Sequence, residues 1–164
     1  HAHMDIAQTR SDPRQNAPVP TYTGWRGGPE GGPTMNVGST LTVPAGTSPS
    51  QILVPKNARR NFFAIQFRGR NLSAYGFTKA GTMTNVSSLD TLGLNVGGVL
   101  HPTARVLYIT QPGTDKLTVT SYDAAYQLSL GTSQKSGDAP CWATTNQAGT
   151  RLYIGETISG SVPV

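Results

Sequence analysis

The run from Asn61 to Arg68, NFFAIQFR, has the two-residue period of a β-strand. Phe63, Ile65 and Phe67 fall on one face of such a strand. The other face carries Phe62, Ala64, Gln66 and Arg68. The pattern predicts a strand that supplies core on one face and, through Arg68, charge at its end.

The composition extends this prediction to the rest of the chain. Only 13% of the residues are charged, while 19 glycines and 12 prolines occur among 164 residues. Amphipathic helices need charged faces and strong helix formers, and this chain has few of either. We therefore expect one all-β domain, built as an antiparallel β-sandwich or a jelly-roll-like barrel.

Turn residues divide the chain after Val37 into short apolar segments. The segment Gln111–Lys116 is expected to join two strands, with Pro112 presetting φ and Gly113 supplying a positive φ. Thr84–Leu94 is expected to form a loop or a short helical turn. The expected strands are Ser39–Val43, Gln51–Val54, Asn61–Arg68, Ala74–Thr78, Gly97–His101, Val106–Thr110, Lys116–Tyr122, Tyr126–Leu130, Thr150–Gly155 and Glu156–Ser159.

The N-terminal segment has a different character. Up to Met35 it carries five prolines and five glycines and shows no hydrophobic periodicity. We interpret residues 1–4 as a cloning scar, residues 5–36 as a flexible arm without a signal peptide, and residues 37–164 as the β-sandwich domain. Two hypotheses stay open for the arm: a solvated tail, or a segment that orders on a neighbouring subunit. Tyr22 and Trp25 favour the second, because such residues are frequent interface anchors.

Positive charge is concentrated in the first half of the chain. The net charge is +5, and no Asp or Glu occurs between Gly31 and Leu89. Such a region is either a solvated face or a contact for an anionic partner. Direct nucleic-acid binding is not expected, because interleaved aromatic residues and base-reading motifs are missing from the sequence. The candidate partner-binding residues are Arg14, Tyr22, Trp25, Arg26, Arg59, Arg60, Arg68 and Arg70.

The sequence marks no catalytic site. Its eight acidic residues are dispersed, and it contains no zinc-spaced cluster, nucleophile elbow or phosphate loop. We interpret His101, which precedes Pro102, as structural, and Cys141 beside Trp142 as a small buried hydrophobic residue. We therefore expect no enzymatic activity, no metal and no cofactor. A single cysteine favours a reducing compartment, and no apolar run approaches the roughly 20 residues of a membrane span.

One stretch resembles a known family. Thr40–Gln66 contains an opening strand, a spacer and then the motif VPKNARRNFFAIQ, and Ala74–Phe77, Gly98–Thr110 and Leu117–Thr120 continue it with further short strands. These residues resemble a pattern of small tailed-bacteriophage virion proteins of the capsid decoration, cement or head-fibre type. The resemblance covers about half of the chain.

The resemblance implies a structural, non-enzymatic protein that stabilises the outside of a phage shell. Such a protein would be a homotrimeric β-sandwich, would be made in the bacterial cytoplasm, and would bind the major capsid protein on the virion surface. The chain departs from the pattern at the turn Phe67–Arg70 and by an insertion between Thr78 and Gly97. The alternative function is a receptor- or carbohydrate-binding module of a tail or fibre, because rings such as Tyr126 and Trp142 can stack on sugars. No membrane partner is expected.

Overall fold

The computed structural model describes residues 8–10, 19–27, 33–44, 46–58, 60–80 and 82–164. These residues form β-strands and connecting loops, with no helix among them, which confirms the all-β class. The strands are β1 (Gln8–Arg10), β2 (Val19–Gly27), β3 (Pro33–Thr42), β4 (Pro49–Leu53), β5 (Asn61–Gln66), β6 (Asn71–Phe77), β7 (Met83–Asp90), β8 (Gly97–Leu100), β9 (Val106–Gln111), β10 (Lys116–Tyr122), β11 (Leu128–Lys135), β12 (Pro140–Thr145) and β13 (Leu152–Glu156).

Each sheet is an antiparallel meander in which neighbours in sequence are neighbours in space. The strands β4 to β7 form one four-stranded sheet and β8 to β11 form a second. A three-stranded sheet, β1 to β3, precedes them, and a two-stranded sheet, β12 and β13, follows. Short connections suffice for this topology, which agrees with the turn residues that punctuate the sequence.

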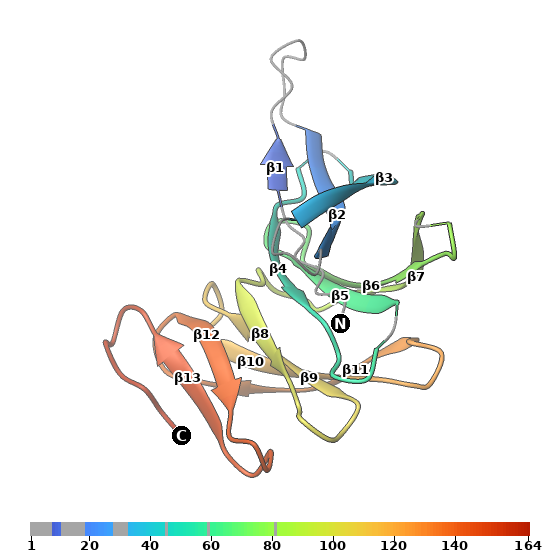
Figure 1. Cartoon of the computed structure of the whole chain (residues 1–164). Coiled ribbons are helices and arrows are strands. Elements are labelled where there is room, and N and C mark those ends of the chain that lie inside the picture. The colour runs from blue at the N-terminus through green and yellow to red at the C-terminus, as the bar shows by residue number, and fades with distance from the viewer. Residues whose placement is uncertain (1–7, 11–18, 28–32, 45, 59, 81) are drawn as a thin grey trace.

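The sheets follow one another in space in the same order as in the chain (Figure 1). The first strands of consecutive sheets contact each other: β4 contacts β8, and β8 contacts β12. The last strands of the two four-stranded sheets, β7 and β11, also contact each other. Gly98 N donates to Gln51 Oε1 (2.8 Å), and Thr110 Oγ1 donates to the Cys141 carbonyl (2.7 Å). Hydrogen bonds thus tie the second four-stranded sheet to the sheets on both sides of it.

Strand β5 is buried on both faces, which differs from the prediction of one core face. Its Phe62 and Ala64 belong to a cluster that includes Tyr22 from β2. Its Phe63 and Ile65 belong to a second cluster, together with side chains of β6 and β9. A strand that lies between two packed sheets must be apolar on both sides, and this explains why both residue sets of the run are mainly apolar.

Most strands lie where the alternation predicts them, and the exceptions have physical reasons. Lys116–Tyr122 has the predicted bounds. The prediction of a loop or helical turn over Thr84–Leu94 is wrong, because Met83–Asp90 is strand β7. This strand lies at the edge of its sheet and is mostly polar, so its alternation carries little hydrophobic signal. Strand β12 was not predicted. Of the predicted strand Glu156–Ser159 only Glu156 lies in a strand, as the last residue of β13, and residues 157–159 form a turn.

The turn after β9 also differs in detail. Asp115 has the positive φ (53°) that Gly113 was expected to supply. Aspartate tolerates this left-handed region better than most residues because its short side chain bonds the local backbone. Asp115 Oδ1 in addition accepts a hydrogen bond from Ala139 N (2.9 Å), which links this turn to the start of β12.

The described part of the N-terminal segment is built into the sheets. It contributes β1, β2 and the start of β3, and β3 runs across the predicted boundary at residue 36. The side chain of Tyr22 is fully buried, with its ring centroid 5.7 Å from that of Tyr75. Burial, reinforced by the nearby Tyr75, raises the pKa of the Tyr22 hydroxyl. Contact of this segment with another subunit stays a prediction.

Candidate ligand-binding site

The meander topology sorts the loops into two groups. Because successive strands are antiparallel, the loops β4–β5, β8–β9, β10–β11 and β12–β13 share one end of the sheets, which we call the cavity end. The loops β5–β6, β7–β8 and β9–β10 share the opposite end, the network end. Residues that are distant in sequence therefore meet at each end.

A cavity of about 770 Å³ opens at the cavity end. Its wall comes from the four loops of that end, between residues 54 and 147. The ionisable side chains of known charge on the wall are Lys56, Arg105 and Asp123, and His101 lies among them. The volume of the cavity falls within the range of small-molecule sites, which is about 300–1,000 Å³.

His101 is held by its own loop. Its Nδ1 accepts hydrogen bonds from Ala104 N (2.9 Å) and Thr103 N (3.2 Å), so the neutral ring carries its proton on Nε2. The other side of the ring faces Gly149, where a Cβ atom would lie 2.4 Å from Cε1 and Nε2. Gly149 also has φ +71°, a conformation that favours glycine. These contacts fit the structural role that the sequence predicts for His101.

Asp123 is likewise engaged in shaping a loop. Its Oδ1 accepts hydrogen bonds from Ala125 N and Gln127 N, both at 2.8 Å. The turn brings Tyr126 into a left-handed conformation with φ 62°. The carbonyl of Tyr126 accepts a hydrogen bond from Ser87 Oγ of β7 (2.8 Å), which anchors the β10–β11 loop to the neighbouring sheet.

Two tyrosines form one wall of the cavity. The rings of Tyr122 and Tyr126 are stacked with centroids 5.6 Å apart and an interplanar angle of 20°. Both rings also lie against Phe63 in the core, at 4.7 and 5.8 Å. Burial raises the pKa of Tyr122, the neighbouring Tyr126 raises it further, and Arg105 acts in the opposite direction. The Tyr122 hydroxyl therefore stays protonated at neutral pH and can donate a hydrogen bond.

The balance of charge at the cavity is positive. Lys56 and Arg105 are exposed, and within the described ranges neither has a carboxylate at salt-bridge distance. The carboxylate of Asp123 already accepts two backbone hydrogen bonds. The site therefore combines two exposed cations that have no salt bridge among the described residues, a tyrosine wall and backbone groups of four loops. This set suits an anionic ligand with hydroxyl groups.

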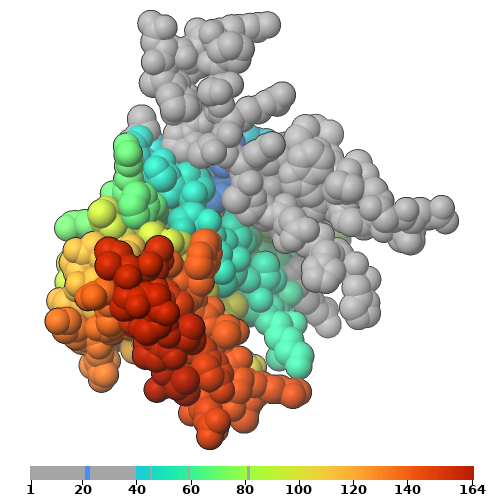
Figure 2. All heavy atoms as spheres, turned by 90° about the vertical axis from the view of Figure 1, so that its left-hand side faces the viewer, coloured from blue at the N-terminus to red at the C-terminus, as the bar shows by residue number. Residues whose placement is uncertain are grey.

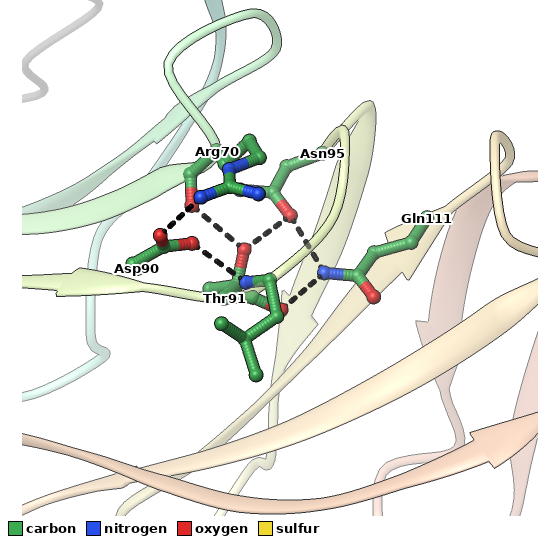
Figure 3. A network of polar contacts seen from close by, with 6 residues as sticks. Arg70, Asp90, Thr91, Asn95 and Gln111 are labelled. Carbon is green, nitrogen blue, oxygen red and sulfur yellow. Dashed lines mark hydrogen bonds and ion pairs between the residues drawn. The ribbon is translucent and has the colours of Figure 1, made fainter.

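A polar network occupies the opposite end (Figure 3). Arg70 Nη2 lies 2.7 Å from Asp90 Oδ2, and Asp90 Oδ1 accepts the N–H of Leu92. Thr91 Oγ1 lies 2.9 Å from the Arg70 carbonyl and 2.7 Å from Asn95 Oδ1. Asn95 in turn reaches the Gln66 carbonyl of β5 at 3.4 Å.

The network continues into the second four-stranded sheet. Gln111 Nε2 donates to the Thr91 carbonyl (2.8 Å) and to Asn95 Oδ1 (3.1 Å), and Gln111 Oε1 accepts from Thr118 Oγ1 (2.9 Å). Thr91, Asn95, Gln111 and Thr118 are all buried. Buried polar groups that are fully paired specify one arrangement, so the network fixes the β7–β8 loop and the two sheets that it joins.

The structure separates the arginines that the sequence groups together. Arg60 lies at the cavity end and Arg68 at the network end, both exposed. The strand between them separates the two residues by roughly 25 Å, at about 3.3 Å a residue. Arg70 lies with Arg68 and pairs with Asp90. A single basic face made of all these side chains is therefore not formed.

The other candidate partner-binding residues lie in the core or outside the described part of the structure. Tyr22 lies in the core and is not available as a surface anchor in this conformation. Trp25 and Arg26 belong to β2, but their side chains lie outside the described part of the structure. Arg14 and Arg59 lie outside the described residues altogether. A role of the exposed arginines in binding a partner stays a prediction.

The described residues contain no group of three or more His, Cys, Asp or Glu side chains arranged to bind a metal ion. The same ranges contain no helix of the length and hydrophobicity needed to cross a bilayer.

Comparison with known proteins identifies the fold. No protein-family model matches the sequence, and no curated protein matches it either. Among solved structures, the chain is similar to a candidate 6-phosphogluconolactonase of Bacteroides fragilis, with a TM-score of 0.77, 13% identity, and coverage of 97% of this chain and 49% of that one. A second, from Bacteroides uniformis, has a TM-score of 0.72, 13% identity and coverage of 98% and 53%.

A periplasmic gluconolactonase of Pseudomonas aeruginosa is also similar, with a TM-score of 0.68, 13% identity and coverage of 94% of this chain and 47% of that one. The chain thus spans about half the length of the solved structures that it matches. At this identity the likeness concerns the fold.

These neighbours correct the family resemblance that the sequence suggested. The resemblance to phage virion proteins is wrong, because the three solved structures described above share the fold of this chain and are bacterial proteins named as gluconolactonases, not phage structural proteins. The capsid decoration function that rested on it, together with its alternative in a tail or fibre, is wrong for the same reason. The short motifs that carried the resemblance describe strands and turns, and such motifs recur in many β folds. The oligomeric state and the localisation stay predictions.

Proposed function

We propose that the sheets form part of a β-propeller-like ring, in place of the predicted sandwich or jelly roll. Propeller blades are four-stranded antiparallel meanders placed around a central axis. The sheets β4–β7 and β8–β11 have this topology; their first strands, β4 and β8, contact each other, and β8 also contacts β12. A two-sheet sandwich offers no place for a third sheet in the same series, whereas a ring does. The neighbours, which are about twice as long, fit the same view.

We further infer that the chain binds a small, hydroxyl-rich anion, such as a phosphorylated sugar acid, in the cavity. The observation that carries this inference is the pair of exposed cations, Lys56 and Arg105, which have no salt bridge among the described residues and lie beside the tyrosine wall. Cations hold a phosphate or carboxylate by charge-assisted hydrogen bonds, and ring faces and hydroxyls suit a sugar chain. Two neighbours are named as candidate 6-phosphogluconolactonases, and the 6-phosphogluconate that such a reaction releases is an anion of this chemical class.

The proposed role is binding without catalysis. Hydrolysis of a lactone needs a group that activates water, and both candidates at the cavity make hydrogen bonds that hold their own loops. His101 Nδ1 accepts two backbone N–H groups, and Asp123 Oδ1 accepts two more. Their hydrogen bonds shape the loops, so we assign them to the scaffold of the site.

Calorimetric titration with 6-phosphogluconate tests the binding role. We expect one site, and we expect Lys56→Gln and Arg105→Gln each to weaken binding by about tenfold, equivalent to the loss of one charged contact of about 1.4 kcal/mol. Lys79→Gln is the matched control, because Lys79 is exposed in another loop of the same end but does not line the cavity. Binding that is absent up to millimolar ligand, or equally weakened by all three changes, would contradict the proposal.

A hydrolysis assay separates binding from catalysis. With D-glucono-lactone in a pH-stat, we expect the protein to leave the rate of acid release at that of the buffer. Acceleration that is lost in His101→Gln or Asp123→Asn would instead support a lactonase, the activity for which the neighbours are named. That result would leave the cavity as the site but replace the binding role by an enzymatic one.

A further inference from the structure

The loop that carries the tyrosine wall is attached to a strand of the neighbouring sheet. Ser87 of β7 donates its hydroxyl hydrogen to the Tyr126 carbonyl (2.8 Å), and the same Oγ accepts the N–H of Leu128 (3.2 Å). Gln127 Nε2 lies 3.4 Å from the carbonyl of Val86, the residue before Ser87. Three successive residues of one sheet are thus bonded to two successive residues of the other.

The two four-stranded sheets are in direct contact, which allows one to hold a loop of the other. Strand β7 contacts β11, and β4 contacts β8. Figure 2 shows cyan and green atoms of the first sheet against yellow and orange atoms of the second. Ser87 is half-buried and does not line the cavity. Any effect of its side chain on a ligand must therefore pass through the loop that it holds.

A β-bulge in β7 turns Ser87 toward this loop. Two successive residues of β6 pair with Asn85 and Ser87, which leaves Val86 as an extra residue. In a regular strand Asn85 and Ser88 would lie on opposite faces, but here Asn85 Nδ2 donates to Ser88 Oγ (3.0 Å). The bulge has therefore shifted the alternation, and Val86 and Ser87 both reach the second sheet. Bulges often re-aim a side chain next to a functional site.

Tyr126 depends on this support because its backbone conformation is unfavourable. Its φ is 62°, in the left-handed region that bulky residues rarely adopt. Such a conformation persists where the surrounding structure determines it. The ring packs on Tyr122 and Phe63, and Ser87 holds the carbonyl. Without the Ser87 hydroxyl the backbone of Tyr126 can relax, and a ring of the cavity wall then moves.

We propose that Ser87 is a positioning residue of the cavity, which holds Tyr126 in the conformation that a bound ligand meets. The inference rests on the proposed binding of a small anion and adds to it a residue from outside the cavity wall. A ligand that packs on the tyrosine rings needs them in fixed positions, because a site that must first be ordered binds more weakly. Ser87 supplies this order before the ligand arrives.

Calorimetric titration of 6-phosphogluconate into Ser87 variants tests the proposal. We expect Ser87→Ala to bind about fivefold more weakly than the wild type, the effect of one lost hydrogen bond. Ser87→Thr keeps the hydroxyl and should bind like the wild type. Ser87→Val has the shape of the Thr variant without its hydroxyl and should bind as weakly as Ser87→Ala. Circular dichroism at the titration temperature confirms that each variant is folded.

Ser88→Ala is the matched control. Ser88 is the next residue of β7, but its hydroxyl lies 3.0 Å from Ser73 Oγ, on the other face of the strand. The change removes a hydrogen bond from the same strand and should leave the affinity for the ligand unchanged. Equal weakening in Ser88→Ala and Ser87→Ala would mean a general disturbance of β7 and would overturn the proposal.

Amide hydrogen exchange of the free protein gives a second measurement that does not depend on the ligand. Asp123 N donates to the Gln127 carbonyl and Tyr126 N to the Asp123 carbonyl, both at 3.1 Å. Neither amide is bonded to Ser87, so faster exchange of both reports a loosened loop. We expect it in Ser87→Ala and not in Ser88→Ala. Unchanged exchange in Ser87→Ala would overturn the positioning role.

The titration distinguishes failure of this inference from failure of the binding role itself. A wild-type protein that does not bind 6-phosphogluconate contradicts the binding role and this inference with it. A wild-type protein that binds, with Ser87→Ala binding equally well, overturns the role of Ser87 alone and leaves the cavity as the site. Weaker binding confined to the variants without the hydroxyl supports the proposal.

Discussion

The carboxylate of Glu156 shows at the scale of one residue how the end of the chain is held. It accepts hydrogen bonds from the hydroxyls of Ser136 (2.8 Å), Ser159 (3.0 Å) and Ser161 (2.8 Å) and from Gly137 N. Burial by itself would raise the pKa of Glu156, but these hydrogen bonds favour the charged form and together lower the pKa below its ordinary value. A carboxylate that accepts several hydrogen bonds thus joins the β11–β12 loop to the turn after β13.

The pH dependence of stability follows from this shift. A group whose pKa is lower in the folded state stabilises the fold above its unfolded pKa, which is about 4.3 for Glu. That contribution is lost as the pH falls through the lower, folded pKa. We expect Glu156→Gln to melt a few degrees below the wild type at pH 7, with the difference shrinking as the pH falls below about 4.

Thermal melts of both proteins between pH 3 and 7 measure this effect. Asp138→Asn is the control, because Asp138 is an exposed acid of the same region. It should follow the wild type at every pH. A constant difference between Glu156→Gln and the wild type across the whole range would mean that the carboxylate charge is not what stabilises this turn.

At the scale of elements, the β7–β8 loop and its polar network connect the two four-stranded sheets. Gly93 lies in this loop, and a Cβ atom there would come within 2.7–2.9 Å of the side-chain amide of Gln111. Gln111 is buried, and its amide bonds Thr91, Asn95 and Thr118, so it has no room to move aside. The packing of this loop therefore helps to set how the second sheet sits against the first, together with the contacts described above.

We expect Gly93→Ala to destabilise the protein by about 1–3 kcal/mol, the usual cost of forcing extra atoms into a packed, hydrogen-bonded site. Chemical denaturation monitored by tyrosine and tryptophan fluorescence measures the change. Gly113→Ala is the control, because a Cβ there meets only Leu94 at ordinary contact distances of 3.6 Å or more. If the two variants lost the same stability, the network would not be the reason for the glycine at position 93.

Sequence patterns predicted the positions of strands better than their surroundings. Strand β10 has the predicted bounds, yet its fully buried side chains are Thr118 and Thr120, and β5 is buried on both faces. The polar edge strand β7 was missed because its exposed residues give no apolar alternation. The cavity could not be predicted, because Lys56, Arg105 and Asp123 lie on separate loops that only the series of sheets brings together. The prediction of one basic face was wrong for the opposite reason. Arg60 and Arg68 are near each other in sequence, but they flank strand β5 and so lie at opposite ends of the sheet.

At the scale of the whole molecule, consecutive meanders lie side by side (Figure 1). Their loops therefore gather at two ends, the cavity end and the network end. The network end is rigid, with buried and paired polar groups. The cavity end leaves cations and tyrosine rings around an open space. The sequence predicted the strands that make up this arrangement but not the order in which the sheets pack, because a strand's period does not reveal which sheet will cover each of its faces.

The central claim is that a small anion binds between the loops of the cavity end. The most direct test is an amide chemical-shift titration of the 15N-labelled protein with 6-phosphogluconate. We predict saturable shifts for the amides of the non-proline residues in the ranges 54–58, 100–105 and 122–126. We predict unchanged signals for residues 91–95 at the network end. Shifts confined to the network end, or no shifts at millimolar ligand, would contradict the account.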